Sequence, residues 1–438
     1  MILLLLLIFL LGACDLLPQG EETPAVTATA PLPTPADTPD IESPPETPES
    51  IAPVQTTITL TVWTTPDIAP RTELPGGSTM LEQFNAYDQS HPDVDLFIEL
   101  KTVSDQGGSL SYLRTGRSVA PDVLPDVVLL PTGHLTAAAA EELIYPLDGV
   151  LPSEMLDDVY PAAREMVTVN DRVVGYPVAL SGLKHVVYDR NIITDTVPNT
   201  WGEFMARGAD DTLIYPAGGP AGAELTLQFY LAAGGSLTTA GGQPVLEAEP
   251  LATALTQLNQ AVAANFVDPQ SGSTVTLEQA WQAFVGGAPN LVETSAGVFL
   301  RQRAEGASGD FAFTPLPGPD GSLAPFVTGW AWTIATADPV RQALAAELIQ
   351  WLASPQNLGE WSRQSRMLPA RPGAFESWPG GDAYVLFLQR QLEAARSFPA
   401  GANSALLQAL SKATADVTLQ LATPEAAAEE AATTVSSP

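Results

Sequence analysis

Short apolar runs alternate with segments of helical periodicity along most of the chain. Three runs rich in β-branched and aromatic residues predict strands, at 57–63 (TITLTVW), 94–100 (VDLFIEL) and 126–130 (DVVLL). Between the first two runs, four apolar residues fall on one face of a predicted helix: Met80, Leu81, Phe84 and Tyr87. The alternation is typical of α/β folds with largely parallel sheets.

Capping residues mark the starts of several further helices. Thr200 to Glu203 and Thr276 to Gln279 have the form of capping boxes, in which paired side chains satisfy free backbone N–H groups. A capping residue also precedes a proline three times, in Asp338-Pro339, Ser354-Pro355 and Thr423-Pro424. In the helix that begins at Pro339, the spacing predicts a buried stripe of four residues: Val340, Leu344, Leu348 and Trp351.

The N-terminal segment resembles a secretion signal. Residues Ile2 to Leu11 form an apolar run of ten, whereas a membrane-spanning helix needs about 20 residues. Leu11-Gly12-Ala13-Cys14 then resembles the lipobox of a bacterial lipoprotein, which implies cleavage after residue 13 and a lipid on Cys14. An incidental thiol is the alternative. No Lys or Arg precedes Arg71, which departs from the usual positive start of such signals.

The next segment, 14–55, predicts a disordered linker. Its residues after Cys14 include ten prolines, six threonines and eight acidic residues, and none is aromatic or basic. Such a composition buries too little apolar surface to offset the entropy of ordering, and it could extend for up to ~100 Å. Residues 56–438 exceed what one hydrophobic core normally supports, so we expect a folded domain of two lobes there.

Composition excludes several classes of function. The chain of 438 residues has 18 basic and 50 acidic residues, a net charge of −32, which argues against a nucleic-acid partner and against adsorption of the folded domain to anionic lipid. One cysteine and three histidines leave no disulfide framework and no Cys/His zinc site. We therefore expect no metal and no cofactor.

The common catalytic motifs are absent. The sequence contains no phosphate-binding loop, no dinucleotide-binding turn, no nucleophile elbow and no zinc-protease motif. An acid pair of the glycosidase kind is neither indicated nor ruled out among so many carboxylates. The sequence therefore does not indicate an enzyme.

Aromatic residues suggest a ligand site instead. Trp63 ends the first predicted strand, and Trp330 shares one face of a later strand with Trp332. Ligands of open α/β sheets bind beyond the carboxyl ends of strands, and indole rings stack well on the C–H faces of sugars. Packing in a core is the alternative for Trp63 and Trp330.

An ordered series of phrases runs through residues 57–430. The phrases are WTT at 63–65, LPDVV at 124–128, LIYPLD at 143–148, NDRVVGYPVALSGLKHVVYDR at 170–190, VPNTWGEF at 197–204, AGG at 233–235, AFVGG at 283–287, PLP at 315–317, GWAW at 329–332, WLASP at 351–355 and LPAR at 368–371. In this order the chain resembles the family 1 extracellular solute-binding proteins, which include the maltose-binding proteins. These are lipid-anchored receptors of ABC importers that mostly take sugars.

The resemblance implies a type II periplasmic-binding-protein-like α/β fold with the ligand cleft between two lobes. Lobe 1 would comprise about 56–178 and 315–375, and lobe 2 about 179–314 and 376–430. Strands would cross between the lobes near Tyr176 to Leu180 and near Phe311 to Pro317. A ligand that touches both lobes would favour their closure, which the transporter reads.

The resemblance also implies which residues face the ligand. Asp126 and Trp201 match the family but are expected to be structural, and Asn403 lies in a loosely matched C-terminal stretch. The expected ligand-binding residues are Trp63, Thr64, Thr65, Leu130, Thr132, Gly133, Ser181, Glu293, Thr294, Ser295, Gly329, Trp330 and Phe398.

The implied function is a monomeric, extracytoplasmic lipoprotein that captures a carbohydrate and delivers it to the permease subunits of an ABC importer. The net charge keeps open a receptor for polyamine or another cationic solute in the same fold. A surface sensor or an enzyme that reuses the scaffold is a third hypothesis, in which Glu293 is the one acid among the matched positions.

Overall fold

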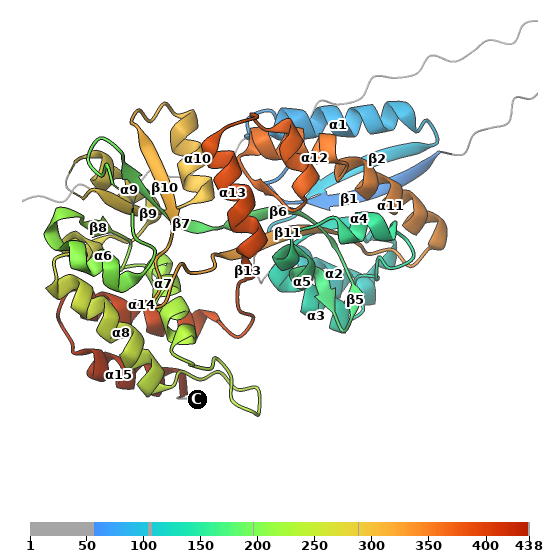
Figure 1. The fold of residues 1–438 in the computed structure, drawn as a ribbon. Helices are drawn as coiled ribbons and strands as arrows, with labels where there is room; N and C mark the ends of the chain where they lie inside the picture. The colour runs from blue at the N-terminus through green and yellow to red at the C-terminus, as the bar shows by residue number, and fades with distance from the viewer. Residues whose placement is uncertain (1–56, 104–106, 196, 288, 437–438) are drawn as a thin grey trace, which may run out of the picture. The chain divides into compact units, whose positions relative to one another are not determined.

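The computed structural model describes residues 57–103, 107–195, 197–287 and 289–436. The predicted signal segment, the linker and Cys14 lie outside the described residues. The described chain forms two main sheets, each with its own helices (Figure 1).

The larger sheet has the strand order β12-β6-β11-β3-β1-β2, with β13 beside β11. Its strands are β1 (Ile58–Thr64), β2 (Val94–Leu100), β3 (Val127–Pro131), β6 (Tyr176–Gly182), β11 (Phe326–Ile334), β12 (Leu368–Pro369) and β13 (Arg396–Ser397). The three strands predicted from the first apolar runs are confirmed as β1, β2 and β3.

The expectation of largely parallel sheets is wrong. Strand β1 is parallel to β2 and β3, but β11 is antiparallel to both β3 and β6. The chain leaves the larger sheet at the end of β6 and returns to it through β11. The chain re-enters the sheet at the same edge at which β6 leaves it, so β11 runs opposite to β6. The sheet is therefore mixed.

Helices cover both faces of the larger sheet. Figure 1 shows α1 and α12 on one side of it and α2, α3 and α5 on the other. The elements of this part are α1 (Gly77–Ser90), α2 (Ser109–Val119), α3 (Leu135–Ala140), α4 (Ser153–Asp157), α5 (Pro161–Val167), α11 (Pro339–Leu352) and α12 (Pro355–Ser365), the short pair β4 (Thr168–Val169) and β5 (Arg172–Val173), and the 3-10 turns η1 (Pro121–Val123), η2 (Thr132–His134) and η5 (Pro372–Ser377). Leu60, Val62 and Val127 are fully buried at the centre of its core.

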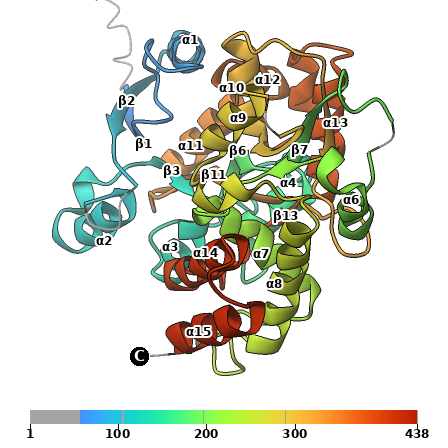
Figure 2. The same ribbon diagram turned by 90° about the vertical axis from the view of Figure 1, so that its left-hand side faces the viewer.

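The smaller sheet has the order β10-β7-β9-β8. Its elements are β7 (Lys184–Asp189), β8 (Leu213–Ile214), β9 (Leu291–Ser295), β10 (Phe311–Pro315), α6 (Trp201–Arg207), α7 (Pro220–Ala232), α8 (Ala248–Ala263), α9 (Leu277–Val285), α10 (Ala296–Ala304), α13 (Ala383–Ala394), α14 (Ser404–Thr418), α15 (Pro424–Ser436), η3 (Gly208–Asp210) and η4 (Pro269–Ser273). Figure 2 shows α7, α8, α14 and α15 grouped together, apart from α9, α10 and α13.

Alternating residues of the smaller sheet serve two cores. Val186 packs in one buried cluster with residues of α7, α8 and α14, whereas Val187 packs in another with residues of α9, α10 and α13. The second cluster also contains Leu180 of β6 and Phe375 of η5. It therefore joins the smaller sheet to elements of the larger one.

Helix starts follow the sequence prediction closely. Thr276 and Gln279 form a complete capping box, whereas Thr200 accepts the N–H of Glu203 without the reciprocal bond to its own backbone. Asp338 and Ser354 cap α11 and α12. Thr423, the third capping residue predicted before a proline, accepts the N–H of residue 426 in the first turn of α15.

The predicted stripe of α11 is partly wrong. Val340 is 59% exposed, and the buried face consists of Ala345, Ala346, Leu348, Ile349 and Leu352. The predicted and the observed faces share Leu348, and the predicted Leu344 and Trp351 are partly buried and pack against the same core. Alanine side chains are small, so the face that contains Ala345 and Ala346 can approach neighbouring elements closely.

Two residues turn the chain from the larger sheet into the smaller one. Gly182 has φ 88° and Leu183 has φ 51°, both in the left-handed region, and the Leu183 N–H donates to the carbonyl of Phe326 at 2.9 Å. The crossing thus follows the end of β6, slightly beyond the predicted segment Tyr176 to Leu180. The return crossing connects the end of β10 with the start of β11. The residue boundaries of the two lobes stay a prediction.

His185, just beyond this crossing, generates a prediction for stability. The imidazole is fully buried, with Nδ1 3.3 Å from the Leu183 carbonyl oxygen and Nε2 3.2 Å from the Tyr384 hydroxyl. Burial lowers the pKa of His185 from 6.5 to about 4. The unfolded chain therefore takes up a proton before the folded one, and stability falls as the pH drops through this window.

We expect the wild-type protein to lose about 3 kcal/mol more unfolding free energy than His185→Gln between pH 6.5 and pH 4. Glutamine keeps a donor and an acceptor but does not titrate. Urea unfolding at a series of pH values measures the difference. Parallel stability profiles for the two proteins would contradict a neutral, buried His185.

Candidate functional site

Several predicted site residues meet at the carboxyl edge of the larger sheet. The Thr132 hydroxyl accepts the N–H of Gly329 at 3.2 Å and lies 3.4 Å from the Met166 sulfur. Trp330 stands between β3 and β6 in the sheet, in register with Pro131 and Ala179. The edge is thus built from η2 and the first half of β11.

Gly329 is required by packing. A Cβ atom at this position would lie 2.7 Å from the carbonyl oxygen of Ala179 and 3.0 Å from the Leu180 side chain. Any larger residue would separate β11 from β6. The Gly329 N–H is bonded to Thr132. Gly329 therefore helps to position η2 beside β11 and shapes the edge through its backbone.

The exposed groups at this edge are polar. The hydroxyls of Ser181 and Thr328 lie 2.9 Å apart on facing positions of β6 and β11, and both residues are exposed. Gly133 is also exposed, and Trp330 is partly exposed. Two exposed hydroxyls therefore lie beside a partly exposed indole that also packs against the core of the larger sheet, which suits a ligand with both polar and apolar faces.

Phe398 lies beside this group. Its N–H donates to the carbonyl of Val327 at 2.9 Å, and its ring is 5.6 Å from that of Phe326. The side chain is partly buried. Asn403, farther along, uses its side-chain oxygen to cap α14.

The residues at the end of β1 are more buried than the sequence suggested. Trp63, Thr64 and Thr65 are 3%, 1% and 1% exposed, and Leu130 is fully buried in the core. The Thr64 hydroxyl donates to the Ile68 carbonyl, whereas the indole N–H of Trp63 has no protein partner. Trp63 therefore presents no open ring face in this structure.

Glu293 is part of a buried ion cluster behind the edge. The ammonium of Lys184 lies 3.1 Å from Glu224 and 3.3 Å from Glu293, and it donates to the Ala221 carbonyl. Burial raises the pKa of Glu293. For Lys184, burial opposes the charged form, but attraction by the two carboxylates outweighs it and raises the pKa. Glu293 is fully buried, so it has no surface to offer a ligand.

The neighbours of Glu293 on β9 have other roles. Thr294 is fully buried and pairs in register with His185. Ser295 accepts the N–H of Val298 at 3.3 Å and so caps α10. The two residues expected to be structural have structural contacts: Asp126 bonds the guanidinium of Arg341 at 2.6 Å, and the Trp201 indole donates to a backbone carbonyl.

Three residues at the edge were missed in the sequence. Thr328 lies two positions before Trp330 on the same strand face, so strand alternation could have found it. Lys101 and Tyr112 surround Trp63, with the Lys101 ammonium 4.7 Å from the indole centroid. Tyr112 is on α2, and no local pattern connects it with the end of β1.

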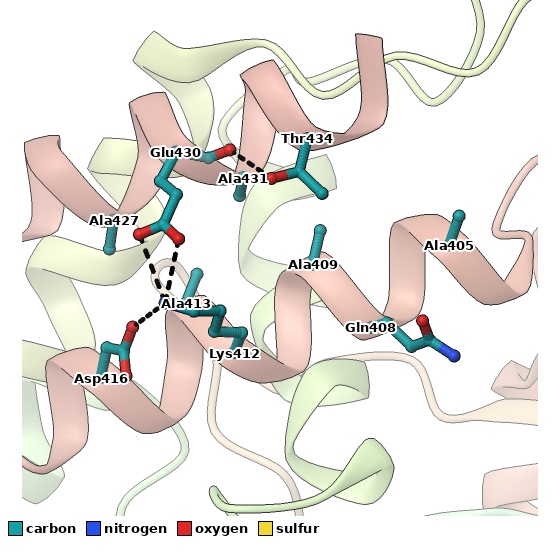
Figure 3. Close-up of a pocket in the computed structure, with 10 residues that line it drawn as sticks. All are labelled: Ala405, Gln408, Ala409, Lys412, Ala413, Asp416, Ala427, Glu430, Ala431 and Thr434. Atoms are coloured by element: carbon teal, nitrogen blue, oxygen red, sulfur yellow. Dashed lines mark hydrogen bonds and ion pairs between the residues drawn. The ribbon is translucent and has the colours of Figure 1, made fainter. Parts of the chain in front are cut away.

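A groove between α14 and α15 lies elsewhere (Figure 3). Alanines line much of it, and Lys412 bonds Asp416 at 2.6 Å and Glu430 at 3.1 Å. Its charged groups are thus paired with one another. Within the described ranges, no cluster of three or more His, Cys, Asp or Glu side chains could hold a metal ion, and no helix is long and apolar enough to cross a bilayer.

A family model of bacterial extracellular solute-binding proteins matches residues 82–383. The chain belongs to this family. The resemblance seen in the ordered sequence phrases is thereby confirmed, and membership makes the protein an extracytoplasmic binding protein. A comparison with curated proteins finds no match.

Solved structures show the same fold at low identity. A cyclic α-maltosyl-1,6-maltose binding protein from Arthrobacter globiformis is 19% identical, with a TM-score of 0.67 over 86% of this chain and 98% of that chain. The sugar-binding protein MalE from Xanthomonas citri is 18% identical, with a TM-score of 0.70 over 86% and 96%. Maltose-bound MalE3 from T. maritima is 17% identical, with a TM-score of 0.63 over 86% and 98%. The two-lobe α/β fold is confirmed.

The buried ion cluster generates a second prediction. We expect Lys184→Met to destabilise the protein by about 3–5 kcal/mol, because it leaves two carboxylates without their cation. Glu293→Gln in the same background should recover part of the loss, since it removes one of the two charges. Urea unfolding measures both variants. A loss below about 1 kcal/mol for Lys184→Met would contradict the structural role of the cluster.

Proposed function

We propose that this solute-binding protein captures a carbohydrate between its two lobes and delivers it to the permease subunits of an ABC importer. The observation that carries the proposal is the exposed hydroxyl pair of Ser181 and Thr328 beside the partly exposed Trp330. An aromatic face and adjacent hydroxyls suit the apolar and polar faces of a sugar ring. Structures with the same fold hold maltose, maltotetraose and mannotriose.

These groups lie where the binding of a ligand would be coupled to closure of the lobes. Ser181 lies near the end of β6 and Thr328 near the start of β11, so a ligand bound there would lie next to the passages between the two lobes. A ligand that contacts both lobes stabilises the closed arrangement by its differential affinity for that state. The importer would then recognise the closed form.

The site favours binding over catalysis. An enzyme on this scaffold would need an accessible acid or base, but Glu293 is buried and paired with Lys184, and the more exposed Glu99 is paired with Lys101. We infer a receptor that works as a monomer without cofactor. We also infer that a lipid on Cys14 and the linker to residue 55 tether the folded part to the cell membrane.

The sugar proposal is tested by thermal denaturation of the full-length protein in mild detergent, with maltose, maltotetraose, mannotriose, spermidine and amino acids. A ligand at 100 times its Kd should stabilise the protein by about 2.7 kcal/mol. We expect a sugar to raise the Tm, and Trp330→Ala to abolish the rise. As a control, Leu386→Ala changes a side chain on α13 that is 48% exposed. A shift with spermidine alone, or an unchanged sugar response in Trp330→Ala, would refute the proposal.

The anchor is tested by fractionation of cells that express the protein. We expect the wild-type protein in the membrane fraction, labelled by radioactive palmitate, because a lipid on Cys14 holds it there. Cys14→Ser should carry no label and should accumulate as the uncleaved precursor. Labelling of the variant at the wild-type level would show that Cys14 is not the modified residue.

A further inference from the structure

A lysine fills an aromatic cage at the end of β1. The Lys101 ammonium lies 4.7 Å from the ring centroid of Trp63, 5.2 Å from that of Tyr112 and 3.3 Å from a carboxylate oxygen of Glu99. The two rings stand edge to face, with centroids 6.4 Å apart. Two aromatic faces and a carboxylate are the groups that recognise an ammonium ion.

The cage is firmly positioned. Trp63 pairs in register with Glu99 across β1 and β2, and the Lys101 N–H donates to the Thr64 carbonyl at 2.8 Å. The N–H of Tyr112 bonds the Gly108 carbonyl at 2.9 Å in the first turn of α2. Strand pairing and helix bonds thus fix the backbone positions from which these four side chains project.

The cage is accessible from one side. Trp63 is 3% exposed, whereas Tyr112 is 48% exposed. The side chains of Lys101 and Glu99 are 21% and 35% exposed. An approaching ligand would therefore meet the ring of Tyr112 and the Glu99–Lys101 ion pair, with Trp63 behind them.

We propose that Lys101 determines ligand class by occupying this cage: it excludes cationic solutes and turns the end of β1 into a subsite for an uncharged, hydroxylated ring. The ammonium already takes the place that an amine ligand would need. With Glu99 it forms a neutral pair of one donor and one acceptor, which can bond neighbouring hydroxyls while Tyr112 packs on the ring face. The sugar part of this inference rests on the proposed function, but the exclusion of cations does not.

The exclusion is tested by isothermal titration of spermidine and of tetramethylammonium into the full-length protein. We expect Lys101→Ala to bind spermidine at least tenfold more tightly than the wild type, because it empties the cage and frees Glu99. Lys101→Met should show no gain, since its unbranched side chain refills the space without a charge. The double variant Lys101→Ala/Tyr112→Ala should lose the gain.

Lys412→Ala is the matched control for net charge. Lys412 is likewise paired with carboxylates, Asp416 and Glu430, but no ring faces it among the aromatic contacts of the described chain. A gain in Lys101→Ala but not in Lys412→Ala supports the cage. Equal spermidine binding by the wild type and both variants would overturn it.

The sugar subsite is tested with maltose, maltotetraose and mannotriose. We expect Tyr112→Ala and Lys101→Ala to weaken the binding of the sugar by tenfold or more, and Tyr112→Phe to retain it. Unchanged sugar affinity in Tyr112→Ala would overturn the subsite and leave the proposed function standing. Failure of the wild type to bind any of these sugars would refute the sugar subsite together with the proposed function, while the spermidine titration would still decide the exclusion of cations.

Discussion

The two-lobe fold depends on how the backbone passes between its two sheets. Gly182 and Leu183 adopt consecutive left-handed conformations, and the carbonyl of Phe326 accepts the Leu183 N–H at 2.9 Å. A Cβ at Gly182 would lie 2.9 Å from the same carbonyl oxygen, so glycine is needed there for both conformation and space. The Arg396 and Phe398 N–H groups bond the adjacent carbonyls of Pro325 and Val327. The passage after β6 and the one after β13 are therefore both tied to the short stretch of backbone that begins β11.

This arrangement explains why charge is buried close to the crossing. Lys184 follows Leu183 directly and enters the smaller sheet between α7 and β9, where Glu224 and Glu293 neutralise it. The cluster costs desolvation energy, and its benefit is directional, because the ammonium must meet two carboxylates and the Ala221 carbonyl at once. A hydrophobic substitute would pack without specifying that geometry. The cluster thus defines the orientation of β7 as it leaves the crossing, and the exposed pair of Ser181 and Thr328 lies just before it.

Local signals in the sequence predicted local structure well. The first three strands and the capped helix starts follow from alternation and capping chemistry, which act over a few residues. Features that depend on distant partners were not predictable in this way. The antiparallel insertion of β11 follows from the route of the whole chain, and the burial of Glu293 requires Lys184 from another strand. The ordered phrases predicted the family and many edge positions, but they could not show that Lys101 and Tyr112 cover Trp63.

Net charge is a poor guide to the ligand of this protein. Eight of the acidic residues lie between residues 15 and 55, and charges on the folded surface are screened over about 10 Å in salt. At the site, the balance is decided by a few contacts: Lys184 is held by two carboxylates, and Lys101 is held by Glu99 and two rings. The one charged pair that is partly exposed at this edge, Lys101 with Glu99, is therefore balanced within an acidic protein. Hydroxyls and aromatic faces, which interact with a ligand over short distances and without regard to the field of the whole molecule, then determine what binds there.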